Sequence, residues 1–232
     1  MNILAIDTSN QALGLAIMKN NELVAELMTN TKKDHSTRLM PAIVSMMENV
    51  DLTPEQLDKI VVARGPGSYT GTRIGVTVAK TIAWALEVPI YTISSLATLA
   101  YNGRFFDGYI CPLFDARRQT VFTGLYQFHH GTLQEVEKDH NVSLDSWLEK
   151  LLTFNKRVMF ISPHMKQLEQ PILSILQNQA VIPEGQFHLP RASSLISLSE
   201  QSENIPVHIV QPNYLRITEA EANLRKRIKD NE

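Results

Sequence analysis

The sequence is poor in cysteine, in glycine and in excess charge of either sign. Cys111 is the single cysteine, which excludes an internal disulfide and is typical of proteins from reducing compartments. Lys plus Arg number 22 against 24 Asp plus Glu, so the basic excess of a dedicated nucleic-acid binder is missing. At 232 residues with 44% hydrophobic side chains, the chain can still bury a core without covalent cross-links.

Long apolar runs are also missing. The longest uncharged apolar stretch, residues 88–103, is interrupted by Pro89 and by several Ser and Thr, and it is too short to span a bilayer. Near the N-terminus, Asp7 comes before the apolar centre of a signal peptide could form. We therefore expect a cytoplasmic protein that has no membrane contact.

The order of the predicted elements indicates an α/β protein. Three strands come first, with turn residues between them that are typical of a meander, and helices then alternate with strands. The strands are expected over residues 2–7, 12–18, 22–29, 60–63 and 89–93. The helices are expected over 39–50 (with Pro41 in or near the first turn), from Thr53, over 72–87 and over 95–101.

A second half begins near Asp107 and repeats part of this pattern. Asp7 and Gln11 have counterparts in Asp115 and Gln119, with the same spacing and each pair in a turn between two predicted strands. We interpret this as a weak internal repeat; the alternative is two unrelated hairpins, because Asp is common in tight turns. Strands are expected over 109–114, 120–128 and 158–161, helices over 143–152 and 165–177, and a solvated helix or frayed end from residue 218.

Four of the ten glycines fall between residues 65 and 75. Backbone amides between a strand and a helix can bind an anion. The spacing, however, fits neither a P-loop, nor the dinucleotide fingerprint, nor a nucleophile elbow around Ser68. We favour a tight turn that leads into a helix.

The helix after this turn carries small residues at every fourth position: Gly71, Gly75, Ala79 and Ala83. Another backbone could approach closely along this ridge, either within the chain or from a partner. A different face of the same helix carries Arg73 and Trp84. Trp84 is a candidate interface anchor, and the alternative is that it belongs to the core.

Residues with catalytic chemistry are few. Asp7 and Asp115 each end a predicted strand, and each could hold a hydrated magnesium ion or cap a turn. None of the seven histidines has zinc-protease spacing, and nothing around Cys111 suggests an activated thiol.

Five short segments, in the same order along residues 2–216, carry a resemblance to a known family. They are Ile3-Leu-Ala-Ile-Asp7-Thr8-Ser9, His35-Ser36-x-Arg38-Leu39-x-Pro41, Gly65-Pro-Gly-Ser-Tyr-Thr-Gly-x-Arg73-x-Gly75, Asp115-Ala-Arg117 and Pro212-x-Tyr214-Leu-Arg216. Together they resemble the TsaB family, also called YeaZ, and the glycine-rich segment is the most specific of them. The resemblance implies the actin-like ATPase fold, with two lobes of related βββαβα units. We expect the lobes at residues 1–104 and 105–217, followed by a charged tail at 218–232.

The resemblance also implies a function. TsaB-like proteins are non-catalytic subunits of the bacterial machinery that places a threonylcarbamoyl group on N6 of an adenosine beside the anticodon. The tRNAs concerned read codons that begin with A. The subunit dimerises with a catalytic paralogue, TsaD, and an ATPase, TsaE, joins them. We expect contact with tRNA only indirectly, through the complex, and a homodimer when the partner is absent.

The same resemblance predicts what the site lacks. The paralogue holds its metal through a His-x-x-x-His pair, and at the matching register this chain has Ser95 and Leu99, of which Leu cannot coordinate. We therefore expect no metal site, no catalytic residue and no peptidase activity. Asp7, Thr8 and Ser9 would form a vestigial phosphate loop without the usual glycine, and ATP or ADP is expected only at an interface shared with the complex.

The first-lobe helices would form the dimer face. The candidate residues for it are Leu39, Ile43, Met47, Gly71, Arg73, Gly75, Ala79, Ala83 and Trp84. The alternative function is an autonomous actin-like ATPase or kinase, suggested by Asp7 and Asp115.

Overall fold

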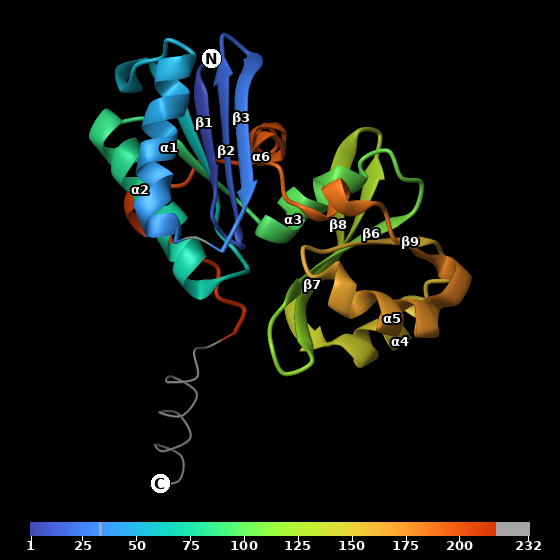
Figure 1. Ribbon diagram of the computed structural model, residues 1–232. Helices are drawn as coiled ribbons and strands as arrows, with labels where there is room; N and C mark the ends of the chain where they lie inside the picture. Colours follow the sequence, from blue (N-terminus) through green and yellow to red (C-terminus); the bar gives the residue numbers. More distant parts are fainter. Residues whose placement is uncertain (33, 217–232) are drawn as a thin grey trace, which may run out of the picture.

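The computed structural model describes residues 1–32 and 34–216, so the predicted charged tail at 218–232 lies outside the described residues. Two five-stranded sheets follow one plan, with the strand orders β3-β2-β1-β4-β5 and β8-β7-β6-β9-β10 (Figure 1). In each sheet the first three strands are antiparallel neighbours, and the last two run parallel to the first of them. Each sheet with its helices is called a lobe below.

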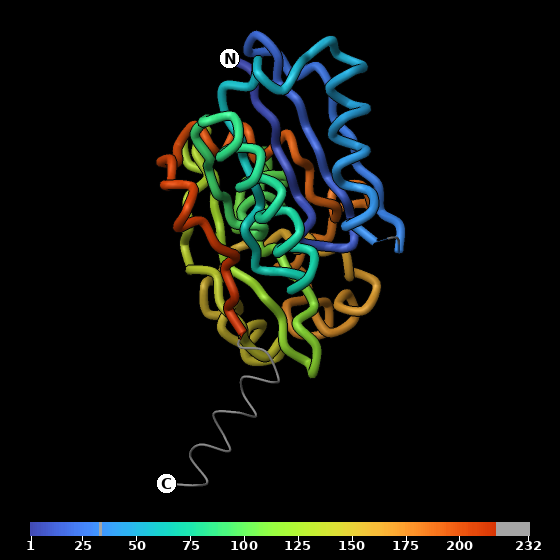
Figure 2. Tube along the Cα trace, turned by 90° about the vertical axis from the view of Figure 1, so that its left-hand side faces the viewer, coloured from blue at the N-terminus to red at the C-terminus, as the bar shows by residue number. Residues whose placement is uncertain are grey.

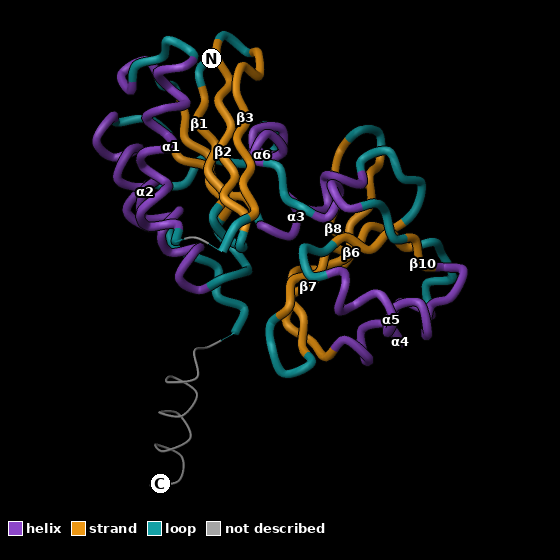
Figure 3. The backbone as a smooth tube through the Cα atoms, in the orientation of Figure 1, coloured by secondary structure: helices purple, strands orange, loops and turns teal. Residues whose placement is uncertain are grey.

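The first lobe is built on β1 (Ile3–Asp7), β2 (Ala12–Lys19), β3 (Glu22–Asn30), β4 (Lys59–Ala63) and β5 (Ile90–Ile93). Its helices α1 (His35–Asn49) and α2 (Tyr69–Leu86) cover one face, and α6 (Ala192–Ser199) covers the other (Figures 1 and 3). Because side chains alternate along a strand, Leu4 and Ile6 of β1 pack toward α1 and α2, while Ile3 and Ala5 pack toward α6.

The second lobe is built on β6 (Tyr109–Asp115), β7 (Thr120–His129), β8 (Thr132–Ser143), β9 (Val158–Ile161) and β10 (Ala180–Val181). One face packs on α4 (Leu144–Leu152) and α5 (Met165–Leu176), with Trp147 fully buried between them and the sheet. The other face packs on α3 (Ser95–Ala100), which follows the last strand of the first lobe. The short helix α3 therefore lies between the lobes, as Figure 1 shows.

The order strand, strand, strand, helix, strand, helix, strand thus occurs twice, once in each lobe. This duplicated arrangement is the actin-like ATPase fold, so the predicted fold class is confirmed. It also confirms the internal repeat, because β1 with Asp7 and β6 with Asp115 are the central strands of their sheets. No helix within residues 1–32 and 34–216 is long and apolar enough to cross a membrane.

Several sequence-based boundaries need correction. Pro41 lies in the second turn of α1 rather than near its start, and the helix expected from Thr53 is a single 3-10 turn, Pro54–Gln56. Strands β8 and β10 and helix α6 were not predicted. Strand β8 is mostly polar and half-exposed, so it lacks the apolar alternation by which a strand is recognised.

The end of the described chain returns to the first lobe, although it belongs to the segment predicted as the second lobe. Helix α6 packs on the first sheet, the Ile205 N–H donates to the Ile90 carbonyl oxygen at 3.1 Å, and Lys80 of α2 donates to the Val210 carbonyl at 2.8 Å. Figure 2 shows this segment, in red, running beside α2. The order of elements along the sequence does not indicate that the chain packs again on the first lobe.

A half-buried carboxylate joins the two lobes. Asp139 on β8 accepts one hydrogen bond from the Tyr126 hydroxyl on β7 and another from the hydroxyl of Ser94, the N-cap of α3. Ser94 in turn accepts from the backbone N–H groups of Leu96 and Ala97. Burial raises the pKa of the Asp139 carboxyl, although both hydrogen bonds act to lower it.

Replacing this carboxylate should therefore destabilise the protein. Asp139→Ala leaves the buried Tyr126 hydroxyl without its acceptor, and we expect a loss of about 2–4 kcal/mol in the free energy of unfolding, measured by urea denaturation. Lys138→Ala, at the exposed neighbouring position on β8, is the control and should change it by less than about 0.5 kcal/mol. Equal stability of the two variants would show that Asp139 does not hold the lobes together.

Candidate functional site

The candidate site lies where the carboxyl ends of β1 and β4 meet. These strands are parallel neighbours, so the turn after β1 (residues 8–11) and the loop after β4 (residues 64–68) leave the sheet at the same edge. This is the edge at which open α/β sheets bind their ligands. The glycine-rich segment therefore faces the residues predicted to form a vestigial phosphate loop.

The two backbone segments are in direct contact. A Cβ atom at Gly67 would lie 2.2 Å from the Ser9 carbonyl oxygen, and one at Gly71 would lie 2.2 Å from the Thr8 carbonyl oxygen. The Ser68 N–H donates to the Ser9 carbonyl at 2.7 Å, and the Thr8 hydroxyl donates to the Gly71 carbonyl at 2.7 Å. Glycine is required here for close approach, which agrees with the predicted tight turn leading into α2, whose N-cap is Ser68.

The Asp7 side chain, at the end of β1, binds the turn that makes this backbone contact. Its Oδ1 accepts hydrogen bonds from the Ser9 N–H at 2.8 Å and the Ser9 hydroxyl at 2.7 Å. Among the described residues its buried Oδ2 has no hydrogen-bond partner, and burial raises the pKa of the carboxyl above its ordinary value. This geometry fits the turn-capping interpretation, since Asp7 Oδ1 and the hydroxyls of Thr8 and Ser9 are hydrogen-bonded within the chain.

The second carboxylate of the repeat has the same geometry. Asp115 Oδ1 accepts from the Arg117 N–H at 2.8 Å, two residues further on, as Asp7 accepts from Ser9. The turn that follows has positive φ at Arg117, Arg118 and Gln119, of 67°, 55° and 59°. Both carboxylates thus cap the turn after the central strand of their sheet.

A cleft of about 460 Å³ separates these two turns. Gln11 and His35 line it from the first lobe, and Asp115, Arg117 and His164 line it from the second. His164 accepts from the Asp115 N–H at 3.5 Å, and burial lowers the pKa of its ring. The cleft can therefore form hydrogen bonds with a polar ligand through imidazole, amide and guanidinium groups.

Sequence reasoning did not place the two histidines in this cleft. His35 belongs to the segment that carries the family resemblance, which is the one signal that could have found it. His164 precedes α5 and has no distinguishing neighbour in the sequence.

The predicted dimer face needs correction. Gly71, Gly75, Ala79 and Ala83 are buried, because this ridge of α2 packs on the turn after β1 and on the first-lobe core. Leu39, Ile43 and Met47 of α1 are likewise buried in that core. Of the nine predicted residues, Arg73 and Trp84 remain on the surface.

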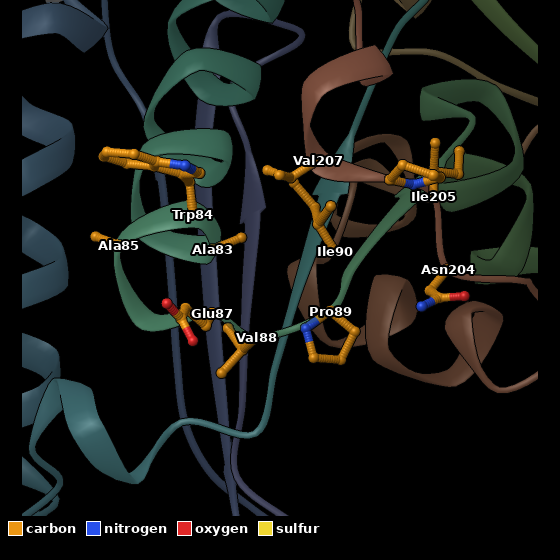
Figure 4. A pocket seen from close by; sticks show the side chains of 11 residues that line it. Ala83, Trp84, Ala85, Glu87, Val88, Pro89, Ile90, Asn204, Ile205 and Val207 are labelled. Carbon is orange, nitrogen blue, oxygen red and sulfur yellow. The ribbon is translucent and has the colours of Figure 1, made fainter.

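Trp84 lies at an exposed hollow near the end of α2. Its side chain is 72% exposed, so the alternative of a core tryptophan is wrong. A groove of about 780 Å³ beside it is lined by Ala83, Pro89 and Ile90 on one side and by Ile205 and Val207 of the returning segment on the other (Figure 4).

The two positions expected to match the paralogue's metal ligands have structural roles. Ser95 and Leu99 are fully buried, and the Ser95 hydroxyl accepts from the Gly65 N–H at 3.0 Å. Leu99 packs between α3 and the second sheet. Within residues 1–32 and 34–216, no three His, Cys, Asp or Glu side chains are grouped so that they could hold a metal ion.

Comparison with known proteins identifies the family. Residues 22–224 match the family model described as TsaD: tRNA N6-adenosine threonylcarbamoyltransferase. The chain is 50% identical, over 96% of its length and 97% of the relative's, to the tRNA threonylcarbamoyladenosine biosynthesis protein TsaB of Bacillus subtilis. The chain belongs to the TsaB family.

More distant members of the family cover the chain as completely. The Escherichia coli protein of the same name is 23% identical over 93% of this chain and 95% of its own length. A solved structure described as YeaZ from Pseudomonas aeruginosa superposes with a TM-score of 0.76 at 24% identity, covering 92% of this chain and 99% of that one. The superposition shows that the two proteins share a fold. The family resemblance found in the sequence motifs is confirmed.

The close backbone contact at the candidate site is testable through its glycines. Gly71→Ala should lower the free energy of unfolding by about 2 kcal/mol or more, because the added methyl group would overlap the Thr8 carbonyl. Gly185→Ala is the matched control, since a Cβ there meets no heavy atom of the described residues within 4 Å. Urea denaturation of both variants measures the difference, and equal losses would contradict the packing described.

Asp7 can be tested through its raised pKa. A carboxyl whose folded-state pKa lies above its unfolded value destabilises the fold increasingly as the pH rises through that raised pKa. Asp7→Asn keeps the acceptor for Ser9 and removes the buried charge. We therefore expect it to be more stable than wild type by about 1–3 kcal/mol near pH 7, with the gain vanishing below about pH 4.

Urea denaturation across this pH range measures the effect, with the exposed Asp107→Asn as control. A stability difference that is independent of pH would show that the Asp7 carboxyl is not the titrating group.

Proposed function

We propose that the chain is the non-catalytic, TsaD-binding subunit of the machinery that forms threonylcarbamoyladenosine in tRNA. The observation that carries the proposal is the 50% identity to a TsaB protein over nearly the whole of both chains. The matched relative is named for tRNA threonylcarbamoyladenosine biosynthesis, and the matching family model is that of TsaD.

The candidate site supports a role without chemistry of its own. Core residues occupy the two positions that correspond to the paralogue's metal ligands, and the phosphate-loop residues are hydrogen-bonded within the chain. A chain arranged in this way contributes by binding and positioning a catalytic partner. The alternative of an autonomous ATPase or kinase is less well supported, since the backbone of residues 67–71 lies against Thr8 and Ser9.

The outer surfaces of α1 and α2, in the first lobe (residues 1–104), are the proposed partner face. Met40 and Val44 lie one turn apart on α1 and are 44% and 50% exposed. Ile74, Val78 and Ile82 form a half-buried apolar line on α2, with Arg73 and Trp84 exposed beside it. An apolar surface on two neighbouring helices suits packing against helices of a paralogue with the same fold.

In this proposal TsaE, an ATPase, joins the pair, and ATP or ADP binds only at an interface that the complex shares. The catalytic partner makes most contacts with the tRNA phosphates, consistent with the net charge of −2 on this subunit. The same helical face allows a homodimer when the partner is absent, and the homodimer would then compete with the heterodimer.

Complex formation tests the proposal. Size-exclusion chromatography of the full chain mixed with its TsaD-like partner should show a stable heterodimer. Val44→Glu should weaken it about tenfold or more, because a charge would be buried in an apolar contact, with no change in melting temperature. Leu173→Glu is the control, because Leu173 on α5 of the second lobe is also an exposed apolar residue, at 40% against 50% for Val44.

Two outcomes would contradict the proposal. One is that no complex forms and the partner is fully active alone. The other is that both glutamate variants bind as wild type does, which would exclude the outer face of α1 as the interface.

A further inference from the structure

A stack of aromatic and arginine side chains lies at the mouth of the cleft. The rings of Tyr69, the first residue of α2, and Tyr214 are stacked with centroids 4.8 Å apart and an interplanar angle of 27°. The Arg73 guanidinium lies over the Tyr69 ring, 5.1 Å from its centroid. Tyr69 and Tyr214 are 42% and 41% exposed, so the stack is a surface feature, which adjoins the proposed partner face at Arg73.

Three further arginines belong to the segments that adjoin this stack. Arg117 lines the same cleft as Tyr69 and is exposed, and Arg216 follows Tyr214 by two residues. The Arg64 carbonyl accepts from the Asn213 N–H at 2.7 Å, which brings a further exposed arginine beside Tyr214. Asp115 is the only carboxylate among the described residues that line the cleft. A chain with a net charge of −2 thus has a local concentration of positive charge here.

The stack is held by both lobes rather than by a free chain end. Arg216 donates through Nη1 to the carbonyl of Ala116, in the turn after β6, at 2.5 Å. The bond from Asn213 to Arg64 ties the same segment to the loop after β4. These contacts give a structural role to the Pro212-x-Tyr214-Leu-Arg216 motif, which the partner face does not explain.

We propose that this surface binds a single-stranded stretch of RNA directly. An unstacked base lies on the exposed ring of Tyr214, while Arg73, Arg117 and Arg216 contact the phosphates on either side. Aromatic rings beside arginines are the usual platform for unpaired bases, because every base has a π-face and each phosphate accepts from a guanidinium. The identity of the RNA as tRNA rests on the proposed function.

This inference changes the expectation that the chain reaches tRNA only indirectly. The adjoining cleft of about 460 Å³ is large enough for a base, and its amide and imidazole groups can form hydrogen bonds with base edges. The contact area is small and the net charge is negative, so the affinity of the isolated chain is low. The surface therefore adds to RNA binding by the partner.

The test measures binding of a fluorescently labelled tRNA transcript that reads a codon beginning with A. The protein is the full chain, both alone and in complex with its TsaD-like partner, at several salt concentrations. Tyr214→Ala should weaken binding about 5- to 100-fold. Arg73→Gln should weaken it and lower the slope of log affinity against log salt by about 1.

Conservative and distant variants serve as controls. Tyr214→Trp retains the stacking surface and should bind as wild type does. Arg104→Gln and Phe105→Ala remove an exposed charge and an exposed ring outside the stack, where Arg104 lies 4.8 Å from the Phe105 ring centroid, and they should leave RNA affinity unchanged. Thermal melts establish that all the variants are folded.

Three results would overturn the inference while leaving the proposed function intact. RNA affinity could be the same for Tyr214→Ala, Arg73→Gln and the controls. The two variants could lose binding of free ATP but not of RNA, which would make the surface a nucleotide site. Tyr214→Ala could also abolish the complex on size exclusion, which would make the stack a protein interface. Failure of the wild-type chain to form a complex with the partner would instead contradict the proposed function.

Discussion

The carbonyl oxygens of Thr8 and Ser9 lie where the Cβ atoms of any other residue at positions 71 and 67 would have to be. This contact joins the turn after β1 to the loop after β4 and sets the position at which α2 begins. Asp7 and Ser68 supply the hydrogen bonds that hold it. The packing of α2 on the first sheet, the mouth of the cleft and the placement of Tyr69 all depend on this backbone approach.

The same contact shapes the first-lobe side of the cleft. The backbone of residues 67–71 packs on Thr8 and Ser9, and Gly67 and Ser68 line the cleft where it faces the second lobe. The two carboxylates of the repeat have become turn caps, each accepting from an N–H two residues further on. The surface carries exposed apolar side chains on the outer side of α1 and α2, and arginines with tyrosines beside the cleft.

The sequence predicts much of this fold because its strongest patterns are local. The glycine cluster indicates the tight turn, and the Asp7 and Asp115 segments indicate a duplication that the two sheets confirm. Long-range features were missed for physical reasons. The helical periodicity of Gly71, Gly75, Ala79 and Ala83 shows that something packs closely on α2, but not whether it is the same chain or a partner. The stack of Tyr69 on Tyr214 joins residues that lie far apart in the sequence, and only the folded chain brings them together.

The central claim is that the chain supports a catalytic partner without taking part in the chemistry. The most direct test is the rate of threonylcarbamoyl transfer to tRNA by the TsaD-like partner, measured with TsaE and ATP, without this chain, with wild type and with Asp7→Asn. The account predicts little transfer without the chain and equal rates with wild type and Asp7→Asn. Full activity without the chain, or a folded Asp7→Asn variant that forms the complex but supports no transfer, would contradict it.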